Sequence, residues 1–313
     1  MKILKPLSGG VMSVQSCPVC GNEKVSAYFR LRSNSLIAVR CRHCTHVFVE
    51  NSPINSSNIA DFYTMNDFKG NRQLQNEQWY TNYYNDCFND YDTHLDSSLV
   101  LKQFEEKLCY CGELFPQKGR LLDIGCATGV FLDMASKHGW EVEGLEVSRD
   151  LAAYARDNFG LKVHCLDLAK DSLDSPPFDV ITLFDLIEHI PNVNEMIKGC
   201  RNNLSDEGIL IIRTPAEEGL LRDIAKIVYN GSLRKFELPM LWFYSFEHIQ
   251  SFSFRSLTRL LEQHNFSVIK VFHEEESLER LSIPKYIKFM LKGVNCLSSM
   301  LNKQHKIVVI AKK

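Results

Sequence analysis

Hydrophobic and polar positions follow two periods over the second half of this 313-residue chain. Short apolar or alternating runs have the pattern of β-strands, and between them apolar residues recur at helical spacing. Five strand patterns alternate with helices within about 95 residues, which predicts a parallel sheet built from right-handed crossovers. The predicted strands are residues 120–123, 141–146, 161–165, 178–184 and 209–213.

Further elements flank this core. The spacing predicts helices over 95–114, 149–158, 219–229 and 257–264, with Ser148 and Ser253 as N-caps and Gly160 as a stop signal. Residues 266–272 and 307–310 have the pattern of two more strands. Between them, apolar residues at steps of four and three predict a helix near 277–304, with a basic flank formed by Lys285, Lys288, Lys292 and Lys303.

The turn after the first strand carries the most specific chemistry. The strand ends in Asp123, and the chain turns through Gly125 and Gly129 before a helix. A dinucleotide site would have glycines in the pattern Gly-x-Gly-x-x-Gly, so that backbone amides approach a pyrophosphate. Here the glycines lie four residues apart, and an acid ends the strand. A carboxylate would repel phosphate and favours a cofactor with positive charge.

Other acids follow the next strands. Glu146 lies about 20 residues beyond the glycine turn, where a carboxylate of a nucleotide-binding unit bonds ribose hydroxyls. Asp167 follows the third strand, and Phe184 and Asp185 follow the fourth. Ligands of parallel sheets bind beyond the carboxyl ends of the strands. These positions therefore predict one binding site along that edge.

The turn resembles motif I of the class I S-adenosylmethionine-dependent methyltransferases, with Ala127 in place of the middle glycine. The resemblance implies a doubly wound, seven-stranded, mostly parallel α/β sheet of Rossmann-like type, whose last two strands form an antiparallel edge pair. It implies S-adenosylmethionine as the cofactor, with Asp167 accepting a hydrogen bond from the adenine amino group. The residues that it places at the cofactor are Asp123, Gly125, Cys126, Gly129, Glu146, Asp167, Phe184 and Asp185.

Two Cys-x-x-Cys pairs lie near the N-terminus, at Cys17/Cys20 and Cys41/Cys44. Two such pairs supply the closed tetrahedral set of a structural zinc site, and residues 25–32 and 37–40 between them have strand patterns. The alternative is a pair of disulfides or redox dithiols. His43 and His46 are nearby alternative ligands, although four thiolates already complete the shell.

Two histidines are candidates for the general base that removes a proton from the methyl acceptor. His189 follows the fourth strand as part of Glu188-His189, and His248 follows the fifth as part of Glu247-His248. We expect His189, His248 and Glu247 to be catalytic. The alternative for each histidine is a polar residue that bonds loop backbone.

A zinc ribbon, a methyltransferase core and a second Glu-His pair together resemble the bacterial zinc-ribbon methyltransferases that act on nucleotide-linked deoxysugars. The resemblance implies methyl transfer to a hydroxyl or carbon of a sugar; ubiquinone-type O-methyltransferases share the Glu188-His189 feature but lack the ribbon. It divides the chain into a zinc ribbon at 1–50, a helical linker or lid at 51–118, and a methyltransferase domain at 119–313 with an inserted helix near 277–304. The tyrosines of the linker are candidates for pocket lining or for half-buried packing: Tyr80, Tyr83, Tyr84 and Tyr91.

The charge and composition of the chain limit the kinds of binding partner that we expect. The formal charge of −2 gives no overall attraction to nucleic acid, so we expect a small-molecule acceptor. With no signal-peptide pattern and no apolar run of membrane-spanning length, we expect a cytoplasmic protein. The basic helix near 277–304 either docks on protein or makes weak contact with a membrane surface. Two other functions remain open: an RNA or protein methyltransferase whose ribbon recognises the target, with Arg30, Arg32, Arg40 and Arg42 as a basic patch, or a non-catalytic cofactor-binding scaffold.

Overall fold

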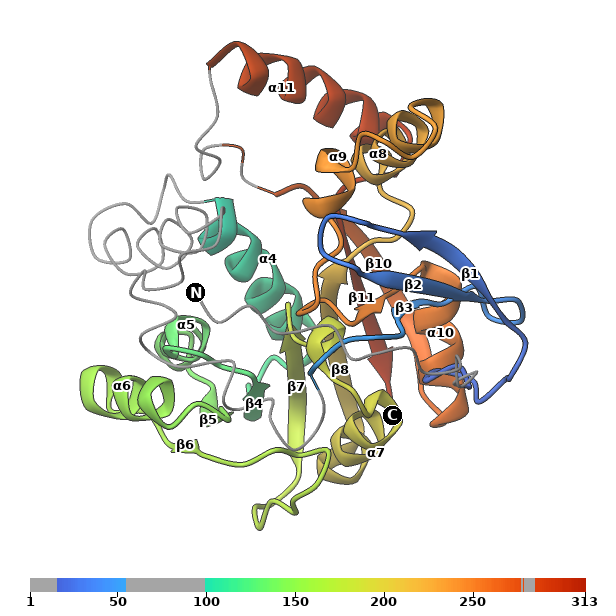
Figure 1. Ribbon diagram of the computed structural model, residues 1–313. Helices are drawn as coiled ribbons and strands as arrows, with labels where there is room; N and C mark the ends of the chain where they lie inside the picture. The colour runs from blue at the N-terminus through green and yellow to red at the C-terminus, as the bar shows by residue number, and fades with distance from the viewer. Residues whose placement is uncertain (1–15, 55–98, 277, 279–284) are drawn as a thin grey trace.

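The computed structural model describes residues 16–54, 99–276, 278 and 285–313 (Figure 1). A seven-stranded sheet with the order β10-β11-β8-β7-β4-β5-β6 forms the centre. The five strands from β8 to β6 run parallel, as the alternation of strand and helix patterns predicted. Their bounds are Arg120–Ile124 for β4, Glu141–Leu145 for β5, Val163–His164 for β6, Phe178–Phe184 for β7 and Leu204–Pro215 for β8.

Helices cover both faces of the sheet (Figure 1). Successive residues of a strand point to opposite faces, so Leu121 and Val180 pack in one layer and Leu122 and Ile181 in the other. The first layer is closed by α4 (Leu99–Leu114), α5 (Val130–Lys137) and α6 (Arg149–Phe159), and the second by α7 (Val193–Asn203) and α10 (Phe254–Gln263). Because both faces are covered, these strands are apolar almost throughout.

Helix boundaries follow local capping chemistry. Ser148 precedes α6 and Gly160 ends it in the left-handed conformation, as predicted. Ser253 caps α10 through a reciprocal pair of hydrogen bonds with Ser256, which starts the helix three residues earlier than its apolar spacing indicated. Strand β8 extends five residues before the predicted start, whereas β6 has only two of the five predicted residues.

The last two strands, β10 (Ser267–Glu274) and β11 (Lys306–Lys312), pair antiparallel at the sheet edge, as the family resemblance implied. Helix α11 (Lys285–Met300) lies between them in sequence and projects from one end of the sheet (Figure 1). Its Phe289 side chain is 79% exposed. None of the helices in the described part of the chain is both long and apolar enough to cross a bilayer. Residues 95–98, Ile283 and the tyrosines of the predicted linker lie outside the described residues.

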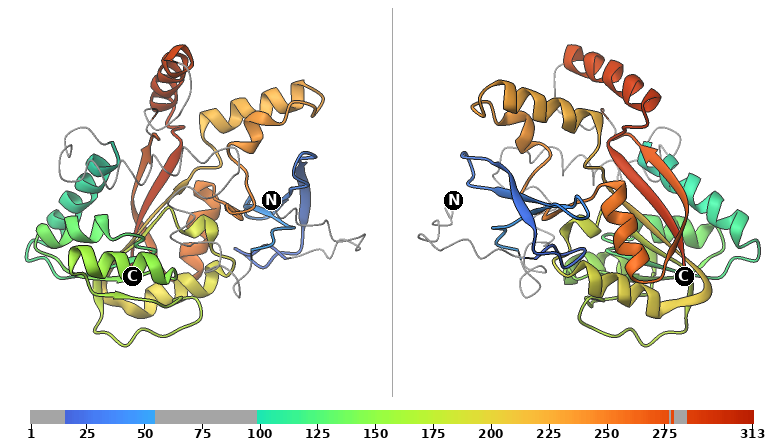
Figure 2. Two further views of the ribbon diagram at one scale, coloured as in Figure 1. Left: turned by 60° about the vertical axis from the view of Figure 1, so that its left-hand side comes forward. Right: turned by 90° about the vertical axis from the view of Figure 1, so that its right-hand side faces the viewer.

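A second, four-stranded sheet contains residues 25–49, part of the N-terminal segment for which the sequence predicted a zinc ribbon and which is called the ribbon below. Strands β1 (Val25–Arg30), β2 (Ile37–Cys41) and β3 (Val47–Val49) are antiparallel, and β9 (Gln250–Ser251) adds to β3. The sequence pattern identified the first two strands only. Side chains of this sheet pack on α8 (Leu220–Gly231) and α9 (Leu238–Leu241), and Figure 2 shows the blue strands next to these gold and orange helices. The ribbon is thus completed by backbone from the second half of the chain.

Candidate functional site

The chain leaves β4 through a left-handed turn that leads directly into α5. Gly125 and Gly129 have φ values of 74° and 86°, and Ala127 between them has 48°. A Cβ atom at Gly125 would lie 2.9 Å from a methyl carbon of Leu186, and one at Gly129 would lie 2.7 Å from a methyl carbon of Leu161. Positive φ and close packing both favour glycine. These two positions therefore fix the path of the turn.

Two buried carboxylates stand beside the turn. Asp123 Oδ1 accepts a 2.6 Å hydrogen bond from the Thr182 hydroxyl, and Glu146 accepts backbone N–H groups of Ala127 (3.0 Å) and Ser148 (2.8 Å). Burial raises the pKa of Asp123 to about 7, and burial also raises the pKa of Glu146. Among the residues that the structure describes, no lysine or arginine forms an ion pair with either carboxylate. Two buried carboxylates that have no ion pair with a described lysine or arginine therefore lie at this turn; they are called the uncompensated carboxylates below.

Cys126 lies inside the same turn and serves packing. Its backbone N–H donates to the Leu145 carbonyl at 3.1 Å, and a Cβ atom at Gly144 would lie 2.7 Å from its sulfur. Burial raises the pKa of this thiol well above its ordinary value, so it stays protonated. Asp167 lies beyond β6, where it accepts the Ala169 N–H at 3.0 Å and pairs with Lys170 at 2.9 Å.

Asp185, at the end of β7, has a different environment. Its Oδ2 accepts hydrogen bonds from Arg213 (2.6 Å) and Lys306 (2.9 Å). Although burial opposes ionisation, these two cations lower the pKa of Asp185. Arg213 is 1% exposed and was not singled out from sequence. The available signal was a charged residue on an otherwise apolar strand, since a buried charge needs partners.

Phe184, the last residue of β7, belongs to an aromatic cluster on the α4 and α5 side. Its ring centroid lies 4.8 Å from that of Phe131 and 5.4 Å from that of Phe104. The Arg213 guanidinium carbon lies 5.1 Å from the Phe184 centroid. This ring therefore packs between the sheet edge and two helices.

The two candidate histidines, which the sequence presented as alternatives, lie side by side. The ring centroids of His189 and His248 are 4.7 Å apart with the planes at 73°. His189 Nδ1 lies 2.9 Å from the carbonyl oxygen of Glu247, which can only accept, so this nitrogen carries the proton. Burial and the neighbouring His189 lower the pKa of His248 well below 6.5. Glu188 completes the group and accepts a 2.9 Å hydrogen bond from Thr214.

The histidine pair is connected to the glycine turn through the β7 loop. Leu186, two residues before Glu188, is the side chain that packs against Gly125. His189 ends the short 3-10 turn Ile187–His189, so it lies one helical turn beyond that contact. A group held at the glycine turn and a group held at the histidines would therefore be neighbours.

A buried network that the sequence did not reveal holds the loop before His248. Glu217 accepts hydrogen bonds from Arg222 (2.9 Å), Ser251 (2.8 Å) and the Tyr244 hydroxyl (2.9 Å). Tyr244 and Ser251 bracket His248 in the chain. The signal was weak, because an acid and an arginine five residues apart are ordinary at the start of a helix.

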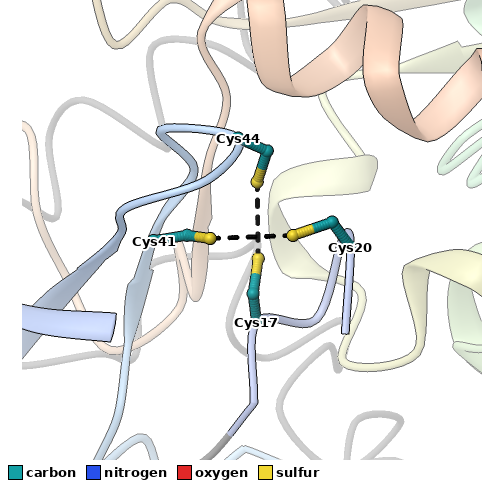
Figure 3. Close-up of side chains that lie close together, drawn as sticks. All are labelled: Cys17, Cys20, Cys41 and Cys44. Atoms are coloured by element: carbon teal, nitrogen blue, oxygen red, sulfur yellow. Dashed lines mark hydrogen bonds between the residues drawn. The ribbon is translucent and has the colours of Figure 1, made fainter. Parts of the chain in front are cut away.

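The four ribbon cysteines converge on one point (Figure 3). The sulfurs of Cys17 and Cys44 are 3.5 Å apart, those of Cys20 and Cys41 are 3.6 Å apart, and all four lie within 4.8 Å of one another. Four thiolates about 2.3 Å from one zinc ion lie roughly 3.8 Å apart in a tetrahedron. The set therefore fits zinc. His46 turns away from it and bonds Gln250 at 2.8 Å.

Comparison with known proteins gives the family. A family described as "Methyltransferase domain" matches residues 94–271, which is more than half of the 313 residues. The chain belongs to this methyltransferase family. The match covers the glycine turn, both acids beside it and both histidines of the pair. It begins after the four ribbon cysteines.

This methyltransferase is similar to "Ubiquinone biosynthesis O-methyltransferase" of Coxiella burnetii, at 29% identity over 39% of the chain and 51% of the relative. The protein of that name from Glaesserella parasuis is 30% identical over 39% of the chain and 53% of the relative. The chain thus spans about half the length of these curated relatives. A methyltransferase structure from Thermotoga maritima, titled a possible histamine N-methyltransferase, matches 75% of this chain and 97% of its own at 18% identity, with a TM-score of 0.48.

Proposed function

We propose that this methyltransferase uses S-adenosylmethionine to methylate a hydroxyl group of a small molecule. The observation that carries the proposal is the pair of uncompensated carboxylates at the glycine turn, inside the matched methyltransferase domain. S-adenosylmethionine supplies a methyl group on a sulfonium, carries an ammonium group and has no phosphate. Its charges suit a carboxylate edge that would repel a dinucleotide.

The residues around the turn divide the binding task. Asp123 is proposed to face a positive charge of the cofactor, and Glu146, which holds the turn through two backbone N–H groups, is proposed to accept the ribose hydroxyls. Gly125, Cys126 and Gly129 shape the backbone against which the cofactor lies. Asp167 is proposed for the adenine amino group and Phe184 for apolar contact. Asp185 keeps Arg213 and Lys306 in place at the same edge.

The acceptor is proposed to lose its proton at the histidine pair. The carbonyl of Glu247 fixes the orientation of His189, and His248 lies against the same ring. A ring nitrogen that carries no hydrogen can accept a proton, so either imidazole is proposed as the general base. The acceptor oxygen then attacks the methyl carbon of the sulfonium in line, and the carbon–sulfur bond breaks with its electron pair going to sulfur. This step depends on positioning, to which the buried loop contacts would contribute.

The acceptor class is proposed from the whole chain. The ribbon beside a methyltransferase core favours a sugar, free or linked to a nucleotide, as the methyl acceptor. The relatives named for ubiquinone biosynthesis favour transfer to oxygen over transfer to carbon. Zinc bound by Cys17, Cys20, Cys41 and Cys44 is proposed to hold the ribbon without taking part in transfer, because four thiolates leave no open position.

Calorimetry with S-adenosylmethionine tests the cofactor. We expect one site per chain, and no binding at millimolar cofactor would exclude the enzyme. Acceptors are then screened by release of S-adenosylhomocysteine, with nucleotide-linked sugars and catechols in parallel. Turnover of catechols alone would contradict the sugar proposal while leaving the methyltransferase in place.

A second candidate is methylation of RNA. All four ribbon arginines, Arg30, Arg32, Arg40 and Arg42, are exposed. A gel shift with RNA that weakens steeply with salt would favour this function, because phosphate contacts release counterions. Absence of any shift at low salt would remove it.

A further inference from the structure

Glu188, His189 and His248 bring three metal-ligating side chains together on the acceptor side of the glycine turn. One carboxylate oxygen and one nitrogen from each imidazole all lie within 4.8 Å of one another. Two ligands about 2.1 Å from a common ion lie roughly 3 to 4 Å apart. Small rotations of the side chains would therefore place all three atoms on one ion.

The hydrogen bonds around the cluster orient it as metal ligands are oriented. A ligating histidine commonly donates its other ring N–H to a carbonyl or carboxylate. His189 does this through Nδ1, which donates to the Glu247 carbonyl at 2.9 Å and thereby makes Nε2 the nitrogen with the lone pair. The Thr214 hydroxyl donates to Glu188 at 2.9 Å, as an outer partner does for a ligating carboxylate.

Within the described ranges, the lysine and arginines near the cluster form ion pairs with other acids and not with Glu188. Arg213 and Lys306 pair with Asp185, and Arg222 pairs with Glu217 at 2.9 Å. Among the residues described, Glu188 forms no ion pair with a lysine or arginine, although it is 2% exposed. Carboxylates this deeply buried are ordinarily hydrogen-bonded, paired with a cation or bound to metal. A divalent cation would supply the missing charge.

We propose that Glu188, His189 and His248 bind a divalent first-row transition-metal ion beside the position of the methyl acceptor. Two imidazoles and one carboxylate bind such ions and leave coordination positions open, in contrast to the closed four-thiolate set of the ribbon. His248 is only half-buried, so the ion would be reachable from one side.

This inference rests on the proposed function, because it concerns how the acceptor loses its proton. A divalent ion lowers the pKa of a hydroxyl that it contacts. The hydroxyl proton leaves to water, an oxygen lone pair forms the bond to the methyl carbon, and the carbon–sulfur bond breaks with its electron pair going to sulfur. With the ion bound, the two histidines act as ligands and the proton goes to water. Without the ion, the two histidines remain the general-base candidates of the proposed function.

Cobalt titration of the full chain, with zinc already in the ribbon, tests the site. We expect one further Co²⁺ per chain, with weak visible d–d absorption and no thiolate charge-transfer band. Glu188→Gln and His248→Gln should each weaken Co²⁺ binding at least about tenfold. Glu195→Gln, a change of an exposed acid on α7, is the matched control and should leave binding unchanged.

A wild-type chain that takes up no Co²⁺ beyond the ribbon overturns the site, and so do variants that bind Co²⁺ as well as the wild type. If Glu188→Gln does not fold, His248→Gln decides alone. Calorimetry with S-adenosylmethionine separates the two proposals. Cofactor binding without Co²⁺ binding removes only the metal site, and Co²⁺ binding without cofactor binding removes only the proposed function.

Discussion

Asp123 lies near the end of β4 and Asp185 directly follows the adjacent parallel strand β7, yet their surroundings differ in kind. Asp123 has a threonine hydroxyl for a partner, and burial raises its pKa to about 7. Asp185 has an arginine and a lysine, which lower its pKa although it too is buried. Among the described residues, the first acid has no lysine or arginine in an ion pair with it and is proposed to meet the charge of the cofactor, whereas the second has two cationic partners within the protein.

The difference separates binding from support. A buried acid without a fixed counter-charge costs folding free energy that a bound cation can recover. A buried acid with two cations stabilises the fold, because removing it takes a counter-charge from both of them, although Lys306 keeps Glu276 and Arg213 has Glu274 at 3.9 Å. Both acids have the same signal in the sequence, an aspartate where an apolar strand ends. Only the partners supplied by β8 and β11 distinguish them.

The largest expected effect is on the neutralised acid. Asp185→Asn leaves the buried Arg213 and Lys306 without a full counter-charge and should lower the free energy of unfolding by about 3–5 kcal/mol. Urea denaturation measures it. Glu195→Gln, which removes the exposed pair with Lys198, is the control and should cost at most about 1 kcal/mol. Equal losses in the two variants would show that the pairing of Asp185 is not structural.

The second largest effect is expected at Asp123, on the affinity for S-adenosylmethionine. Asp123→Asn keeps a hydrogen-bond acceptor for Thr182 but removes the charge, so affinity for S-adenosylmethionine should fall at least about 100-fold, near 2.7 kcal/mol. Calorimetry measures it, with Asp150→Asn on the exposed start of α6 as the control. Unchanged affinity in Asp123→Asn would remove this carboxylate from the cofactor site.

The third effect is the pH dependence of folding stability that follows from the raised pKa of Asp123. Because the folded pKa of Asp123 is about 7 and its ordinary value is 3.8, the folded chain binds a proton between these values that the unfolded chain has lost. Its contribution to stability is therefore present below about pH 4 and is lost as the pH rises through about 7. From pH 5 to 8, wild type should lose roughly 1–3 kcal/mol more than Asp123→Asn. Thermal unfolding across this range measures it, and parallel pH profiles would contradict the raised pKa.

The smallest effect concerns the turn between the acids. Ala127 has φ 48°, which an alanine adopts at a cost, so Ala127→Gly should raise the free energy of unfolding by about 0.5–1 kcal/mol. Ala135→Gly inside helix α5 is the matched control, and its effect should be opposite in sign. A destabilised Ala127→Gly would mean that the methyl group packs favourably against the turn.

Much of the fold was predictable because its signals are local. Apolar runs gave the five parallel strands, and Ser148 and Gly160 gave the limits of α6. The cysteine spacing predicted four sulfurs that do converge. Contacts between distant segments could not be predicted from local patterns. Strand β9, Gln250–Ser251, is too short to show strand periodicity. The proximity of His189 to His248 depends on a loop held by Glu217.

The pairing of β3 with β9 has one more consequence. His46 bonds Gln250, two residues beyond His248, so the cysteine-bearing hairpin braces the segment that presents a catalytic candidate. Zinc is proposed at the four sulfurs of this hairpin, and its removal would then loosen the segment of His248 without touching any group that contacts the acceptor. Likewise, the hairpin grafted onto another transferase would not brace that enzyme's active site unless residues 245–251 were grafted with it.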